Sequence, residues 1–222
     1  LLPIHFREPS INMGIAGMNG KLPHLVGEHL LKAAGLRPGT AAAHALTYLD
    51  FDNAARRYGK VGGFAHLATL VKQLKASRPG ALLLDGGDTW QGSGTSLWTK
   101  GQDMVDCMAL LKPDAMTAHW EFTLGTARVK ELIGQLGFPF LAQNVRDTEW
   151  DETAFDAMRM VERGGVKVAI IGQALPYTAI ANPRWMIPNW SFGIRENDLR
   201  ANVEKARKEG AELVVLLSHN GF

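Results

Sequence analysis

The sequence predicts an α/β fold, mainly because of the pattern of apolar residues after residue 61. Short apolar runs, typical of buried strands, alternate with longer segments in which apolar residues recur at helical spacing. This alternation is typical of strands joined by crossover helices, so we expect a mostly parallel sheet with helices packed against it. With 222 residues, 46% of them hydrophobic and 21% charged, the chain is long enough for one sizeable globular domain.

The first 60 residues show little periodicity and are predicted to be an irregular segment or an insertion. A short helix over 25–34, ended by Gly35, is the exception. The alanine-rich and charged stretch 37–58 shows no clear pattern. This part of the sequence holds four histidines, His5, His24, His29 and His44. Their spacing fits no compact set of metal ligands, so we expect scattered surface histidines.

Residues 61–222 are predicted to form the βα core. The first helix, over 64–77, carries one apolar stripe that we expect to be buried, formed by Phe64, Leu67, Leu70, Val71 and Leu74. Further helices are expected over 103–111, 126–136 and 196–209. Strands are expected over 81–84, 115–117, 140–142, 158–162, 166–171 and 213–217, with a hairpin turn at Gly164–Gly165.

The composition excludes some classes of partner. With 24 basic and 22 acidic residues, the formal charge of +2 indicates neither a nucleic-acid partner nor an anionic membrane surface. The sequence contains no apolar run approaching the roughly 20 residues of a membrane span. Its single cysteine, Cys107, excludes an internal disulfide.

Polar residues follow the predicted strands, and they indicate where a site would form. The run Ala81–Leu84 breaks at Asp85-Gly86-Gly87-Asp88, where two glycines allow a tight turn and a close approach to a ligand. His119 follows the next strand, Gln143-Asn144 and Gln173 follow later ones, and His219 follows the last. Open α/β sheets gather their ligands at the carboxyl ends of strands, so these side chains are expected at one edge.

Asp88, His119 and His219 make a plausible partial metal site. Carboxylate and imidazole donors suit manganese, iron or zinc better than magnesium or calcium. Three ligands are too few for two metal ions. Taken singly, each residue also fits a capped turn or a hydrogen-bonded core histidine.

Several motifs resemble known proteins. GGD at 86–88, HWEFTLG at 119–125, QNV at 143–145 and LSHNG at 217–221 resemble the calcineurin-type metallophosphoesterase domain of the 5′-nucleotidase family. DGGDTWQGSG at 85–94, HWEFT at 119–123, YGKVGGFAHLATLVK at 58–72 and LLPIHFREPS at 1–10 resemble the SoxB family, the thiosulfohydrolases of bacterial sulfur oxidation. The resemblance covers essentially the whole chain.

The resemblance implies an N-terminal catalytic domain with a four-layer αββα fold and a site for two manganese ions. Asp88 would be the bridging carboxylate, and His119 and His219 would be further ligands. Glu121 and Asn144 would orient ligands or substrate, although Glu121 also fits a solvated turn carboxylate. The domain is expected to be incomplete at both ends, because the family has a D-x-H motif upstream, a second histidine motif downstream and a C-terminal substrate domain.

Trp120 and Thr123 occupy the positions at which nucleotidases carry a catalytic histidine and its aspartate partner. An indole N–H does not titrate and a hydroxyl carries no charge, so this pair cannot replace the dyad. Trp120 also fits a simple packing residue. The substitution favours hydrolysis of a cysteine S-thiosulfonate, whose persulfide leaving group needs little protonation. The implied function is sulfate release from a SoxYZ-type carrier in the periplasm; the alternatives are a 5′-nucleotidase or phosphodiesterase, or a non-catalytic carrier-binding module.

Overall fold

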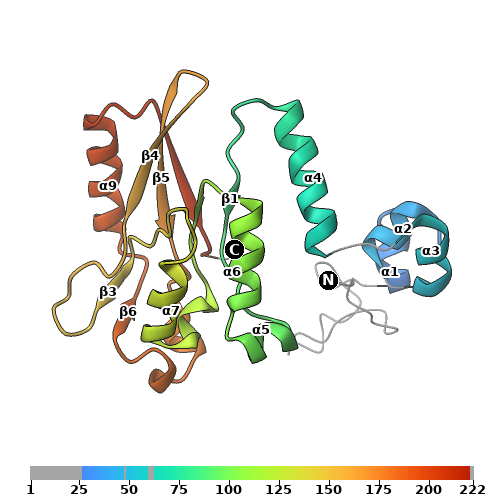
Figure 1. The fold of residues 1–222 in the computed structure, drawn as a ribbon, viewed down its shortest axis with the longest axis horizontal. Helices are drawn as coiled ribbons and strands as arrows, with labels where there is room; N and C mark the ends of the chain where they lie inside the picture. Colours follow the sequence, from blue (N-terminus) through green and yellow to red (C-terminus); the bar gives the residue numbers. More distant parts are fainter. Residues whose placement is uncertain (1–26, 48, 60–62, 221–222) are drawn as a thin grey trace. The chain divides into compact units, whose positions relative to one another are not determined.

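The computed structural model describes residues 27–47, 49–59 and 63–220 (Figure 1). By internal packing the chain divides into two units, Leu1–Leu74 and Lys75–Phe222. None of the helices in the described ranges is long and apolar enough to cross a membrane. Residues 1–26 lie outside the described ranges. They include His5, His24 and the motif LLPIHFREPS at 1–10.

The described part of the first unit is helical. It contains α1 (Gly27–Ala33), α2 (Ala41–Leu46), α3 (Phe51–Tyr58) and most of α4 (Phe64–Ser77). Helix α1 matches the predicted helix, but α2 and α3 correct the expectation that 37–58 is irregular. Helix α2 forms because Thr40 caps it, its hydroxyl accepting a hydrogen bond from the Ala43 N–H at 3.2 Å, and because alanine favours helix. Each helix is too short to show a clear period in sequence.

His44 is buried, which corrects the expectation of a surface histidine. Its side chain is 2% exposed, and Nε2 lies 2.7 Å from the carbonyl oxygen of Gly59 at the end of α3. The ring also packs at a tilt against Phe51, with centroids 5.4 Å apart. His29, in contrast, is exposed as predicted. The buried histidine thus ties α2 to the end of α3.

Helix α4 has the predicted bounds but not the predicted burial. None of its residues is buried, and Leu67, Leu70 and Leu74 are 41%, 51% and 41% exposed. The expectation of a buried stripe is therefore wrong for the described structure. Helical spacing determines which residues share a face, but it does not determine what covers that face.

The described part of the second unit, residues 75–220, contains three small sheets. The strands are β1 (Leu84–Asp85), β2 (Ala115–Met116), β3 (Val145–Asp147), β4 (Met158–Arg163), β5 (Val166–Gln173), β6 (Trp190–Phe192) and β7 (Leu213–Ser218). Pairs β1–β2 and β5–β7 are parallel, whereas β3–β6 and the hairpin β4–β5 are antiparallel. The expectation of one mostly parallel sheet is thus wrong. The predicted strand over 140–142 appears only as isolated bridges at Phe140 and Leu141.

The helices of the second unit are α5 (Gly94–Thr99), α6 (Gln102–Leu111), α7 (Thr126–Ile133), α8 (Thr178–Ala181) and α9 (Glu196–Lys208). Two 3₁₀ helices, η2 (Trp120–Leu124) and η3 (Arg184–Met186), complete it. Helices α6 and α9 agree with the predictions, and α7 ends at Ile133, three residues before the predicted end at 136. The short elements α5, α8, η2, η3, β3 and β6 were not predicted.

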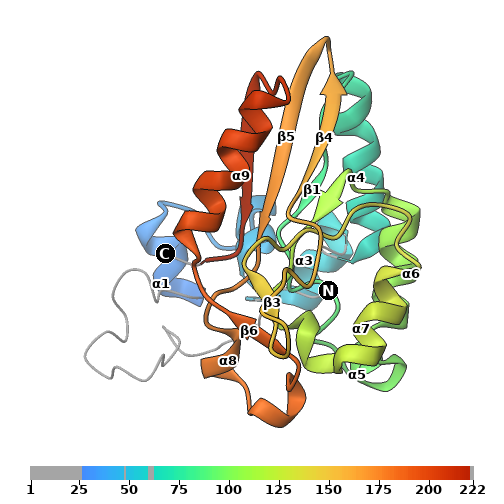
Figure 2. The same ribbon diagram turned by 90° about the vertical axis from the view of Figure 1, so that its left-hand side faces the viewer.

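Two layers of strands lie between two layers of helices, which confirms the four-layer αββα fold. Alternate strand residues join different hydrophobic clusters, as side chains on opposite faces must. On β2, Ala115 and Met116 belong to different clusters; on β5, Val168 shares the cluster of Ala115, whereas Ala169 packs with Ala206 of α9. Figures 1 and 2 show α9 on one side of the strands and α6 and α7 on the other.

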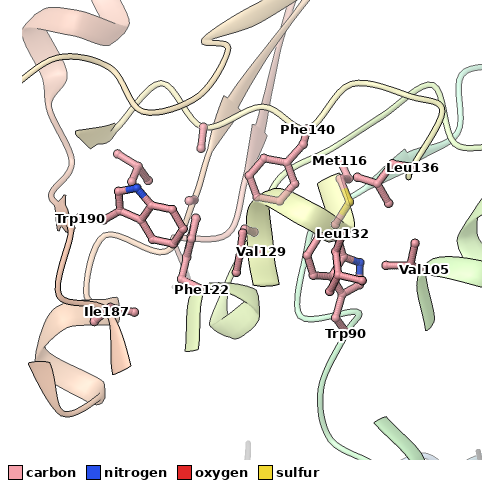
Figure 3. Close-up of a cluster of buried hydrophobic side chains, with 14 residues drawn as sticks. Trp90, Val105, Met116, Phe122, Val129, Leu132, Leu136, Phe140, Ile187 and Trp190 are labelled. Carbon is pink, nitrogen blue, oxygen red and sulfur yellow. The ribbon is translucent and has the colours of Figure 1, made fainter. Parts of the chain in front are cut away.

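The largest cluster lies on the side of α6 and α7 and is rich in aromatic rings. Figure 3 shows Phe122 close to Trp190 and Val129, with Trp90 at the other end of the cluster. Phe122 makes edge contacts with the rings of Trp190 and Phe192, whose centroids lie 5.4 and 5.0 Å away. Since Phe122 belongs to η2, this core fixes the segment that follows His119.

The two strand layers approach each other closely at Gly172 of β5. A Cβ atom at this position would clash with the backbone and side chain of Leu141. We expect Gly172→Ala to lower the free energy of unfolding by about 1–3 kcal/mol or more, because neither backbone can yield without displacing a strand. Urea unfolding of the whole protein measures this. Gly134→Ala is the matched control, because its backbone is helical and a Cβ meets nothing closer than 3.4 Å; equal midpoints would contradict the packing account.

Candidate metal centre

The turn after β1 presents Asp88 at the end of the strand. Its shape is set by Asp85, whose carboxylate accepts hydrogen bonds from the Gly87 N–H at 3.0 Å and the Thr89 hydroxyl at 2.8 Å. Asp88 itself has a φ of 62°, a left-handed conformation that aspartate tolerates better than most residues. Its side chain is 46% exposed, so the carboxylate is available to a ligand.

Gly87 brings this turn against the loop that follows β2. It has a φ of 90°, and a Cβ there would lie 2.7 Å from the Cα of Ala118. The sequence predicted that these glycines allow a close approach to a ligand; at Gly87 the structure shows a close approach to a neighbouring loop. The close approach is to the backbone of Ala118, and it places Asp88 beside His119.

His119 faces Asp88 across this contact. Its Nδ1 lies 3.2 Å from Oδ1 of Asp88, and its side chain is 17% exposed. This contact is not a hydrogen bond, and Nδ1 is buried without a hydrogen-bond partner among the described residues. A buried polar atom without a partner carries a desolvation cost that a bound ligand removes.

His219 lies directly against His119, although 100 positions separate them in sequence. The two imidazole rings stack with centroids 4.3 Å apart and an interplanar angle of 16°. Nδ1 of His219 lies 2.7 Å from the carbonyl oxygen of Gly86, an acceptor, so Nδ1 carries the proton. The lone pair of His219 is therefore on Nε2, which is the usual arrangement for a metal-ligating histidine with a carbonyl partner.

Glu121 is fully buried and ties the two loops together. One carboxylate oxygen accepts a hydrogen bond from the Thr89 N–H at 2.7 Å, and the other accepts from the His119 N–H at 2.6 Å. Burial raises the pKa of Glu121, and the hydrogen bonds from backbone N–H groups oppose that rise. Its burial rules out the solvated turn carboxylate that the sequence had left open.

We expect Glu121→Ala to destabilise the fold by about 2 kcal/mol, because it leaves two part-buried N–H groups without acceptors. Removal of the buried charge offsets part of this loss. Urea unfolding of the metal-free protein measures the effect, with Glu149→Ala as control because Glu149 is exposed. If the two variants unfold at the same urea concentration, Glu121 is not the link between the loops.

Trp120 and Thr123 lie on the first turn after His119. The Trp120 ring stacks on the His119 ring at 5.0 Å and is 39% exposed. The Thr123 hydroxyl donates to the Trp120 carbonyl at 2.6 Å, and the side-chain amide of Gln91 donates to both of these oxygens. The Trp120 ring therefore covers one side of His119, and the Thr123 hydroxyl is occupied by local hydrogen bonds.

Asn144 lies at the same end of the strands but contacts other partners. It is fully buried, and its hydrogen bonds go to the backbone of Ala174 and Gly193. Gln143 and Gln173 are also fully buried and bond to each other. The structure thus brings Asp88, His119, His219 and Glu121 into one cluster. The Asn144 side chain makes no hydrogen bond to these four residues among the described contacts.

The donors present fit part of a site for a divalent metal ion. Nδ1 of His119, which has no hydrogen-bond partner among the described residues, the lone pair on Nε2 of His219 and the exposed carboxylate of Asp88 are suitable ligands. Within the described ranges, however, no group of three or more His, Cys, Asp or Glu side chains is arranged to hold a metal ion. The two imidazoles are stacked face to face, so Asp88, His119 and His219 supply only part of a ligand set and a bound ion would need further ligands.

Two residues near the site were missed in the sequence. Thr89 joins the turn of Asp85 to Glu121, and Gln91 holds the Trp120 and Thr123 positions. Both lie within three residues of the GGD motif, and this closeness was the only signal of their role in the sequence. Their partners lie about 30 residues away, and no local pattern identifies such contacts.

Comparison with known proteins places these motifs in context. No family model matches the chain. Snake venom 5′-nucleotidase from Naja atra is 30% identical over 168 residues, which cover 72% of this chain and 31% of the relative. The structure of a Thermus thermophilus sulfate thiohydrolase, SoxB, in complex with glycerol superimposes with a TM-score of 0.79 and 39% identity, covering 99% of this chain and 41% of that one.

A 5′-nucleotidase precursor from Thermus thermophilus superimposes with a TM-score of 0.66 and 29% identity, covering 73% of this chain and 32% of the other. The chain thus spans less than half the length of each of these proteins. In sequence and in fold, it is related to SoxB and the 5′-nucleotidases and has the architecture of the calcineurin-like phosphoesterases.

Proposed function

We propose that the chain is part of a metal-dependent hydrolase that releases sulfate from a cysteine S-thiosulfonate on a sulfur carrier protein. The observation that carries this proposal is the extent of the match to SoxB, which covers 99% of the chain at 39% identity. The nucleotidase matches cover 72–73% of the chain at about 30% identity. The shared architecture therefore includes parts of the chain that the nucleotidases do not match.

The residues at the dyad positions support the same substrate class. Trp120 stacks on His119, and Thr123 uses its hydroxyl within the turn, so neither side chain offers a titratable proton to a leaving group. An alkoxide leaving group, as in a nucleotide ester, needs such a proton. A persulfide does not, because it leaves as a stable anion.

The reaction balances without a general acid. Water adds an oxygen to the terminal sulfonate sulfur, and the bond between that sulfur and the adjacent sulfane sulfur breaks. Sulfate and the carrier persulfide result, with both protons of the water released to solvent or to the products. The reaction is a hydrolysis, and no electrons pass to or from an external acceptor or donor. It therefore requires no redox partner.

Asp88, His119 and His219 would hold the metal, which we propose to be manganese, with two ions in the complete site. A bound divalent ion polarises an anionic substrate and lowers the pKa of water. The chain's own contribution is to fix the donors: Gly86 selects the tautomer of His219, and Glu121 anchors the backbone of His119. The remaining ligands would come from outside the described residues.

The proposed partner is a SoxYZ-type carrier with a flexible cysteine-bearing arm, and the proposed compartment is the periplasm. The exposed indole of Trp120, next to His119, offers an apolar surface for such an arm. A non-catalytic binding module is the second candidate, favoured by the absence of a three-residue metal group within the described ranges.

The test offers an S-thiosulfonated carrier peptide and AMP to the whole protein, side by side. We expect sulfate release from the peptide and slow turnover of AMP. The double variant Trp120→His/Thr123→Asp should gain AMP hydrolysis, because it restores a proton donor beside the site. Fast AMP hydrolysis by the unaltered protein, without sulfate release, would favour a nucleotidase, and turnover of neither would favour a binding module.

A further inference from the structure

The segment Gln173–Leu175 links the two histidine-bearing loops through its backbone. The carbonyl of Gln173 accepts a hydrogen bond from the His219 N–H at 2.9 Å. Two residues later, the Leu175 N–H donates to the carbonyl of Ala118 at 3.0 Å, directly before His119. A shift of this segment therefore moves both histidines.

Asn144 holds the residue at the centre of this segment. Its Oδ1 accepts from the Ala174 N–H at 2.9 Å, and its Nδ2 donates to the Ala174 carbonyl at 2.9 Å and to the Gly193 carbonyl at 2.8 Å. The side chain is fully buried. An amide is suited to this role because it both donates and accepts, so it satisfies both backbone groups of one residue.

A pair of buried glutamines supports the same segment. Nε2 of Gln143 donates to Oε1 of Gln173 at 2.5 Å, and Nε2 of Gln173 donates to the Ile194 carbonyl at 3.2 Å. The segment is thus held from two directions, by the side chain of Asn144 and by this pair. Connected buried polar groups of this kind fix one conformation when they are satisfied.

We propose that Asn144 is a positioning residue that sets the separation and stacking of His119 and His219 by holding Ala174. The inference rests on the proposed function for its link to the metal, because it assigns these two histidines as ligands. Asn144 itself contacts neither ring among the described contacts. It acts through the backbone of Gln173–Leu175 on both loops at once.

The first test uses the metal-free protein. In the wild type, the stacked rings shift each other's imidazole proton resonances in the NMR spectrum. In Asn144→Ala, we expect the resonances of both His119 and His219 to move toward the values of unstacked imidazole. Asn202→Ala is the matched control, because Asn202 lies on α9 and donates to the Asp198 carbonyl; it should leave both resonances unchanged.

The second test measures manganese binding by calorimetry on the folded variants. We expect Asn144→Ala to weaken the affinity by roughly 10- to 100-fold, as is typical when the support of a ligand is removed. Asn144→Asp serves if the alanine variant does not fold, since it keeps the acceptor for the Ala174 N–H and loses both donors. It should shift the same two resonances and weaken binding in the same direction.

The outcomes separate this inference from the proposed function. If Asn144 variants unfold more easily but keep wild-type resonances and manganese affinity, Asn144 is merely structural and the inference is wrong. If the wild type binds no manganese while the variants still lose the stacking shift, the positioning role stands and the proposed function fails. If the Asn144 variants shift the resonances of both histidines and also bind manganese more weakly, the result supports both the positioning role of Asn144 and the proposed function.

Discussion

Replacing His119 by alanine is expected to remove bound manganese and to lower sulfate release from an S-thiosulfonated peptide by at least about 100-fold. His119 is the residue through which the candidate site is assembled. Its Nδ1 lies 3.2 Å from the Asp88 carboxylate, its ring stacks on His219, and its backbone N–H is held by Glu121. Removing the imidazole deletes one donor and the surface against which the second is placed.

The effect should be local to the site. The His119 side chain contributes no hydrogen bond among the described residues, so the alanine variant should lose only the packing of its ring on Trp120 and His219 and should stay folded. His29→Ala is the control, because His29 is exposed on α1. Metal content is measured by elemental analysis of the purified whole protein. A His119→Ala variant with its full metal content would remove His119 from the ligand set.

Phe122→Ala is expected to have the largest effect on stability, a loss of about 3–5 kcal/mol. Phe122 is fully buried, and four aromatic rings surround it, those of Phe140, Phe155, Trp190 and Phe192. Truncation leaves a cavity that these rigid rings cannot fill. Because Phe122 anchors η2, we also expect weaker metal binding, since His119 directly precedes that helix.

The control for this prediction is Trp150→Ala, which removes a larger ring at a position that is 72% exposed. It should change the free energy of unfolding by less than about 0.5 kcal/mol. Urea unfolding followed by circular dichroism gives both values. If the two variants lose a similar free energy of unfolding, the packing of Phe122 does not stabilise the fold in the way proposed here.

The sequence predicted the longer elements because several turns or strand residues are enough to show a regular spacing of apolar side chains. Helices α4, α6 and α9 and the hairpin β4–β5 appear at the predicted positions, with boundary differences of a few residues. The two-residue strands β1 and β2 were found because they belong to longer apolar runs. Strand pairing was not predictable in the same way, because the register of β3 with β6 depends on contacts across about 45 residues.

That Asp88, His119 and His219 lie together could be predicted, because chain direction places strand ends at one edge. Parallel pairing of β1 with β2 puts Asp88 and His119 at one edge, and parallel pairing of β5 with β7 puts His219 at the end of its strand. Their detailed contacts could not be predicted. The stacking of the histidine rings and the hydrogen bonds from Asn144 to Ala174 and Gly193 depend on backbone positions that no local pattern encodes.

The glycines show the same limit at single residues. A Gly-Gly turn before Asp88 indicates a backbone that must turn tightly, and Gly87 does so with a φ of 90°. What it approaches is the Ala118 backbone, a neighbour decided by the tertiary fold. The Gly-Gly motif therefore indicates a backbone position where a side chain would be unfavourable. Only the structure identifies the atoms that such a side chain would meet.

The most direct test of the central claim is to locate manganese by anomalous diffraction from crystals of the whole protein. The account predicts a peak within about 2.0–2.3 Å of the Asp88 carboxylate and of Nε2 of His219, with a ring nitrogen of His119 in the same ligand set. A peak bound elsewhere, or manganese-loaded crystals with no peak at these side chains, would contradict it.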